Sequence, residues 1–88
     1  MKLKENFVLR QVADSYVVVA VGAASVDFNG MLTLNDSGAL LWRKLEGGAD
    51  HAALLASLTS EYDVDEAQAA RDLDEFLSSL RSAGCLAE

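Results

Sequence analysis

Short apolar runs rich in β-branched residues fill the first part of the chain, as is typical of strands. Residues 7–12 (FVLRQV) predict one strand, and residues 16–21 (YVVVAV) predict a second. Because the second run is apolar at consecutive positions, we expect both of its faces to be covered and the strand to lie in the middle of a sheet. Asp14 and Ser15, between the two runs, predict a hairpin turn.

The connection that follows carries another turn signal. Val26–Phe28 is expected to pair briefly, and Asn29-Gly30 is a strong signal for a type I′ turn. A last, very short strand is then predicted at Met31, Leu32, Thr33 and Leu34. Since side chains alternate along a strand, the two leucines are expected to face one side of the sheet, with the methionine and the threonine on the other.

Helical periodicity begins directly after this strand. The first helix is expected to start near residues 35–37 (NDS), whose side chains suit a helix N-cap, and to end at Gly47-Gly48. The second is expected to run from Asp50 to about Tyr62. The expected inward-facing residues of these two helices are Gly38, Leu41, Trp42, Leu45, Leu54, Leu55, Leu58 and Tyr62.

A third helix is the best defined of the set. Asp65, with Gln68 three residues later, resembles a capping box, and Gly84 is expected to end the helix. Leu86 is then placed to fold back onto the helix end. The apolar stripe of this helix is Ala69, Leu73, Phe76, Leu77 and Leu80.

Strands followed by helices predict an α+β fold, with helices on one face of an antiparallel sheet. The closest shape is winged-helix-like: a three-stranded antiparallel sheet followed by three helices. The chain has no proline and no linker-like segment, so residues 1–88 predict a single domain.

Composition narrows the range of partners. The net charge is −7, with 14 acidic residues against 7 basic ones, which disfavours nucleic acid and anionic membranes. The longest apolar run, residues 16–24, is far shorter than the ~20 residues of a membrane helix, and the first residues do not resemble a signal peptide. Cys85 is the single cysteine, so no intramolecular disulfide forms. These features predict a soluble, cytoplasmic protein.

Residues suited to catalysis or metal binding are scarce. His51 is the single histidine and has no second histidine or nearby cysteine to share a metal with. Cys85 is far from it in sequence and is better read as a small buried residue. Asp63, Asp65 and Glu66 lack the spacing of a calcium loop and suit helix capping. We therefore expect a protein that is not an enzyme, with no cofactor and no metal.

Two binding modes remain open from the residues alone. A helix-turn-helix made by the second and third helices would bind DNA, but the third helix carries five acidic residues against two arginines, which phosphates would repel. The other mode is peptide capture, in which the edge of the short last strand templates a strand from another chain. An ordinary protected edge, or self-association through it, is an equal alternative at this point.

One ordered set of residues resembles the PqqD family, named for the small protein D of pyrroloquinoline quinone biosynthesis. It consists of LNDSGALLW at 34–42, Leu45 with Gly47-Gly48, EYDV at 61–64, DLDEFL at 72–77, and Leu80, Gly84 and Leu86. The opening FVLRQVADSYVVVAVG at 7–22 is also similar, so the resemblance covers essentially the whole chain.

The resemblance implies a module that recognises the leader of a ribosomally made, modified peptide. The leader would add as a strand beside the last strand and be presented to a modifying enzyme such as a radical SAM maturase. The implied contact residues are Met31, Leu32, Thr33 and Leu34 on the strand and, by helical spacing, Asp74, Leu77, Ser78 and Arg81 on the third helix. The connection GAASVDFNG lacks the proline usual in the quinone-pathway type, so we expect another precursor. A nucleic-acid-binding winged helix and a structural subunit of a partner enzyme are the alternatives.

Overall fold

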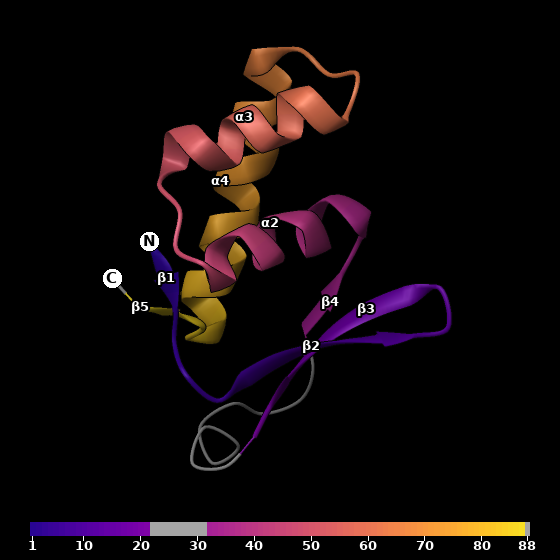
Figure 1. Ribbon diagram of the computed structural model, residues 1–88, viewed down its shortest axis with the longest axis vertical. Coiled ribbons are helices and arrows are strands. Elements are labelled where there is room, and N and C mark those ends of the chain that lie inside the picture. Colours follow the sequence, from indigo (N-terminus) through magenta and orange to yellow (C-terminus); the bar gives the residue numbers. More distant parts are fainter. Residues whose placement is uncertain (22–31, 88) are drawn as a thin grey trace.

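The structure is a computed structural model that describes residues 1–21 and 32–87 (Figure 1). Within them, a three-stranded antiparallel sheet is followed by three helices, as expected for an α+β, winged-helix-like fold. The elements are β1 (Lys2–Leu3), β2 (Phe7–Val12), β3 (Ser15–Ala20), β4 (Leu32–Leu34), α2 (Asp36–Glu46), α3 (His51–Glu61), α4 (Glu66–Ala83) and β5 (Leu86–Ala87). The pairing expected for Val26–Phe28 lies outside the described residues.

The main sheet has the order β2-β3-β4, so β3 is its central strand, as its apolar character predicts. The loop between β2 and β3 is Ala13-Asp14, one residue earlier than the turn expected from the sequence, and Ser15 already belongs to β3. Ala13 has φ +54°, as the first residue of a type II′ turn does. That turn matches the twist of the two strands and closes the hairpin with two loop residues.

The three helices begin at the expected caps. Asn35, Asp50 and Asp65 each have extended backbone, and each side chain accepts a hydrogen bond from the amide three residues later. Gly84 ends α4 with φ +77°, a conformation that glycine adopts without strain. Gln68 completes only half of a capping box, since its side chain bonds Asp72 rather than returning to residue 65.

Asn35 has a double function as a cap, because its Oδ1 accepts from the Gly38 amide at 2.8 Å and from the Ser37 hydroxyl at 3.0 Å. We predict that Asn35→Ala lowers the free energy of unfolding by about 1 kcal/mol, the usual cost of losing an N-cap. Urea unfolding followed by the fluorescence of Trp42 measures this change. Asn35→Asp, which keeps the acceptor, is the control and should stay close to wild type.

The hydrophobic core lies between the sheet and the helices. Trp42, which the helical stripe places inward, is completely buried, and its indole Nε1 has no hydrogen-bond partner among the described residues. The other fully buried large side chains are Leu45, Leu54, Leu73, Leu80, Val18 and Cys85. No helix within residues 1–21 and 32–87 combines the length and the apolar character needed to cross a membrane.

A second, two-stranded sheet pairs the two ends of the chain, so N and C lie close together in Figure 1. β1 runs antiparallel to β5, and the Lys4 amide donates to the Cys85 carbonyl at 2.8 Å. The Met1 carbonyl accepts from the Ala49 amide at 3.0 Å. The sequence pattern gave no signal for these strands, because two residues are too few to show a period. The expected return of Leu86 onto the helix end is confirmed, since it is buried in the core.

Cys85, the residue before β5, is fully buried in the core, as expected for a small apolar side chain. Burial raises its pKa from the ordinary 9.0, and the nearby Lys4 ammonium opposes the rise only in part. Because the pKa of the thiol is higher in the folded than in the unfolded state, the neutral thiol contributes its full share of stability below the ordinary pKa. That contribution is lost as the pH rises through the pKa of the folded state. We predict that stability falls from about pH 8 to about pH 10 more steeply for wild type than for Cys85→Ala. Urea unfolding at the two pH values measures the free energy of unfolding. The same loss of stability between them in wild type and in Cys85→Ala would contradict this.

Candidate peptide-binding groove

Backbone hydrogen bonds alternate along β3, and their order can be derived from the hairpin. In a two-residue hairpin, the residues that close the loop exchange both of their backbone hydrogen bonds, and here they are Val12 and Ser15. The odd residues of β3 therefore bond β2, and the even residues bond β4. The Val21 amide, which donates to the Asn6 carbonyl at 2.8 Å on the β2 side, follows the same alternation.

The register between β3 and β4 then shows which backbone groups of β4 point away from β3. Leu34 and Leu32 lie opposite the even residues Tyr16 and Val18, so their backbone groups bond β3. Thr33 lies opposite Val17, and its N–H and C=O point to the outer edge. No strand among residues 1–21 and 32–87 pairs with that edge. The edge continues one step further, since the Asn35 amide also lacks a bond within the described part of the chain.

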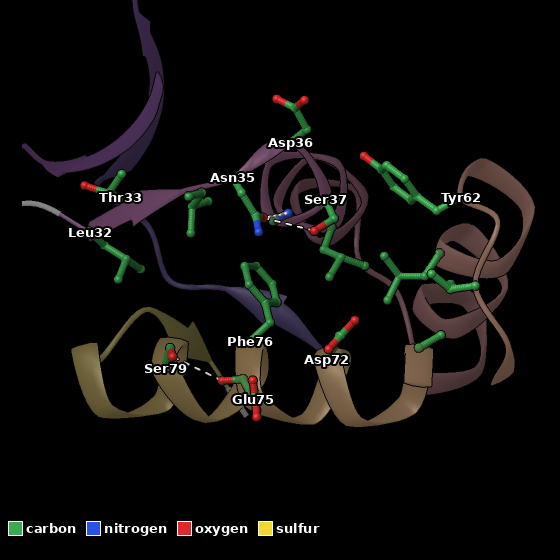
Figure 2. Close-up of a pocket in the computed structure, with 16 residues that line it drawn as sticks. Leu32, Thr33, Asn35, Asp36, Ser37, Tyr62, Asp72, Glu75, Phe76 and Ser79 are labelled. Atoms are coloured by element: carbon green, nitrogen blue, oxygen red, sulfur yellow. Dashed lines mark hydrogen bonds between the residues drawn. The ribbon is translucent and has the colours of Figure 1, made fainter. Parts of the chain in front are cut away.

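A hollow of about 620 Å³ opens beside this edge, between β4 and α4 (Figure 2). The start of α2 and the end of α3 close its other sides. We call it the β4–α4 groove. Its lining residues are Leu32, Thr33, Leu34, Asn35, Asp36, Ser37, Gly38, Leu41, Leu58, Tyr62, Val64, Ala69, Asp72, Glu75, Phe76 and Ser79.

Phe76 forms the apolar centre of the groove. Its ring projects from α4 into the space below β4, and Leu32 points from the strand toward the helix (Figure 2). Leu41 and Leu58 also line the groove but are nearly buried, whereas Tyr62 and Val64 are 36% and 37% exposed. Exposed apolar side chains gathered around a hollow are typical of a binding surface.

Gly38 allows α2 to approach β4 and α4 closely. A Cβ at this position would lie 3.2 Å from the Leu34 Cβ and 3.2 Å from the Asn35 Oδ1, and 3.4 Å from the Phe76 ring. These distances are tight, so a larger residue would shift the groove wall. The LNDSG phrase thus combines the end of a strand, a helix cap and a close contact in one segment.

The polar part of the groove is acidic. Asp36 lies at the start of α2, and Asp72 and Glu75 lie on the α4 side (Figure 2). No lysine or arginine is among the described lining residues. Asp72 accepts from the Gln68 side chain at 2.9 Å, which holds the carboxylate in place without neutralising it.

The strand residues expected from the sequence do line the groove. Leu32, Thr33 and Leu34 all contribute to its wall, with the predicted alternation, since Leu34 is buried and Thr33 is exposed. Met31 lies outside the described residues, so its contact with a peptide stays a prediction.

The helix residues expected from spacing lie elsewhere on α4, and none of them lines the groove. Asp74 faces α3, where its carboxylate is 3.1 Å from His51 Nε2. Leu77 is 2% exposed and belongs to the core, whereas Ser78 and Arg81 are exposed. Their contact with a peptide stays a prediction as well.

The groove side of α4 instead presents Asp72, Glu75, Phe76 and Ser79. Both sets flank the same apolar stripe, one on each side. Helical spacing alone gives two equivalent flanks and does not say which one faces the strand edge.

A model of the family "Coenzyme PQQ synthesis protein D (PqqD)" matches residues 15–86. The chain therefore belongs to the PqqD family, as its sequence motifs indicated. No curated protein matches the chain.

Two solved structures are similar over nearly the whole chain. One is described as lasso peptide synthetase B1 complexed with the leader peptide; it is 28% identical, with a TM-score of 0.77, and the match covers 99% of this chain and 96% of that one. The other is TbiB1 in complex with the TbiA(beta) leader peptide, at 26% identity and a TM-score of 0.74, covering 93% and 90%.

Proposed function

We propose that this protein binds the leader segment of a ribosomally synthesised precursor peptide in the β4–α4 groove and presents it to a modifying enzyme. The observation that carries the proposal is the outer edge of β4, with which no strand among residues 1–21 and 32–87 pairs, and where the Thr33 N–H and C=O and the Asn35 N–H open onto a hollow. Two structural relatives that cover almost the whole chain hold leader peptides.

The leader would add to the sheet as a further strand beside β4. Backbone hydrogen bonds to Thr33 and Asn35 give affinity that does not depend on the leader's sequence. Side chains on alternate positions of the leader then meet the groove wall, where Phe76 and Leu32 give an apolar surface. Ordering a flexible leader costs roughly 2–5 kcal/mol, so a preformed edge and groove favour binding.

The protein acts in this proposal as a binding partner and not as a catalyst. The groove contains no histidine, cysteine or lysine among its described lining residues, and its side chains suit recognition. The modifying enzyme, such as a radical SAM maturase, supplies the chemistry. A cytoplasmic location is part of the proposal, since a free buried cysteine is at home in a reducing compartment.

An NMR titration tests the proposal. The protein is labelled with nitrogen-15 and mixed with the leader of a short precursor peptide encoded beside it. We expect the largest shifts at Thr33, Leu34 and Asn35, with a second set at Asp72, Glu75, Phe76 and Ser79. Shifts confined to the β2 edge or to the β1–β5 sheet would contradict it. Sizing the free protein reports self-association through β4, the competing use of the same edge.

A further inference from the structure

The acidic residues of the β4–α4 groove have no basic partners within it. Asp36 and Glu75 take part in no salt bridge among the described residues, and the one ion pair found there joins His51 to Asp74 outside the groove. Residues 22–31, which precede β4 in sequence, contain no lysine or arginine. Within the described residues, the chain therefore brings carboxylates to the outer edge of β4 without pairing them to a lysine or arginine, and Arg71, next to Asp72 in sequence, donates to the Gln68 side chain instead.

Two of these carboxylates are spaced to meet one strand. Asp72 and Glu75 are three residues apart on α4, so their side chains are neighbours on one helix face, with Cβ atoms about 5–6 Å apart. Residues i and i+2 of an extended peptide face the same side at about 6.6 Å. One or two basic side chains on the helix-facing side of a bound strand would thus reach both carboxylates.

We propose that the bound leader carries lysine or arginine on the face that meets α4, and that Asp72 and Glu75 select for it. This inference rests on the proposed function, because it assigns the charge of the segment that fills the groove. Apolar residues of the same segment meet Phe76, and the basic residues lie beside them toward the acidic rim. The free edge fixes the backbone of the leader, and the charges distinguish one leader from another.

The expected size of the effect follows from measured ion pairs. An exposed pair is worth about 0.2–1 kcal/mol, and a pair partly shielded from water is worth more. Removing both carboxylates should therefore lower the affinity for a basic leader on the order of tenfold. The effect should shrink at high salt, since exposed charges are screened over about 10 Å at 0.1 M.

The test uses a displayed library of random peptides of about 10 residues, the length of a long strand. The library is selected on the wild-type protein and on a double variant, Asp72→Asn with Glu75→Gln. The control is Glu46→Gln with Glu61→Gln, which removes the same net charge from exposed ends of α2 and α3 outside the groove. Asparagine at residue 72 keeps the acceptor for Gln68, so the helix face is preserved.

We expect wild type and control to enrich peptides with lysine or arginine at alternate positions, and the groove variant to lose that preference while still binding peptides. Synthetic copies of enriched peptides should bind the groove variant on the order of tenfold more weakly at about 20 mM salt, with a smaller difference at about 500 mM. Peptides that shift Thr33 and Asn35 amides but show no basic preference would overturn this inference and leave the proposed function standing. Absence of any peptide binding at β4 would overturn both.

Discussion

Replacing Thr33 by proline is expected to weaken leader binding about 30-fold or more while the protein stays folded. The Thr33 N–H points away from β3, so proline removes no bond of the existing sheet. It does remove the donor that an added strand needs and leaves a peptide carbonyl unpaired, at a cost of about 2 kcal/mol or more. Isothermal titration with the leader measures the affinity, and urea unfolding measures the stability.

Two further variants distinguish the loss of the Thr33 N–H from the loss of the threonine side chain and from unfolding of the sheet. Thr33→Ala keeps the backbone donor and should bind within a few-fold of wild type. Leu34→Pro removes a donor that bonds β3, leaves a β3 carbonyl unpaired and should destabilise the protein by about 1–3 kcal/mol. A Thr33→Pro protein that unfolds as readily as Leu34→Pro would show that the alternation along β4 is reversed. Full leader binding by a folded Thr33→Pro protein would rule out pairing at this position.

Replacing Leu77 by alanine is expected to lower the free energy of unfolding by about 2–5 kcal/mol, the usual cost of truncating a buried leucine. Leu77 is 2% exposed and packs in the core behind the groove wall. Because native domains are stable by only about 5–15 kcal/mol, this is a large share of the total. Urea unfolding followed by Trp42 fluorescence measures the change.

Ser78→Ala, one position along the same helix, is the matched control and should change stability by less than about 0.5 kcal/mol, as exposed substitutions do. The comparison also decides between the two flanks of α4. If Leu77→Ala left stability unchanged and selectively weakened leader binding, Leu77 would face the peptide, as helical spacing alone led us to expect. Loss of stability with leader affinity retained in the folded fraction would place it in the core.

The shortness of β4 has a physical explanation. The strand ends at Leu34 because Asn35 turns its side chain to cap α2, and its carbonyl already accepts from the Ala39 amide. Three residues are sufficient to pair with the centre of β3 on one side. On the other side, Thr33 and the Asn35 amide have no backbone partner within residues 1–21 and 32–87 and lie beside the groove. The short strand is therefore a docking edge with little core of its own.

Local signals in the sequence predict most of the fold. Caps such as Asn35 and Asp65 act on amides three residues away, so the residues that start each helix are adjacent to it in sequence. The β-branched run of β3 predicts a buried central strand for the same local reason. The motif from Leu34 to Trp42 indicates membership of the PqqD family, and the family match over residues 15–86 confirms it.

The groove itself depends on contacts between distant residues, and local patterns do not contain them. Asp72 and Phe76 line the groove while Leu73 and Leu77 are buried in the core, an orientation that depends on how α4 packs against the rest of the molecule, α3 included. The apolar stripe fixes only which side of the helix is inward. The His51–Asp74 pair, with its side chains 49% and 70% exposed, lies on the opposite flank. The sequence shows that acidic residues outnumber basic ones, but it does not show that three of the acidic residues line the groove.

Hydrogen exchange of individual amides in the free and leader-bound protein tests the central claim most directly. Amides that are hydrogen-bonded in a sheet exchange slowly, and amides open to water exchange fast. We predict that Leu32 and Leu34 are protected in both states, whereas Thr33 and Asn35 exchange fast in the free protein and become protected when the leader binds. Protection of Thr33 before any leader is added, or fast exchange at both positions in the saturated complex, would contradict strand addition at β4.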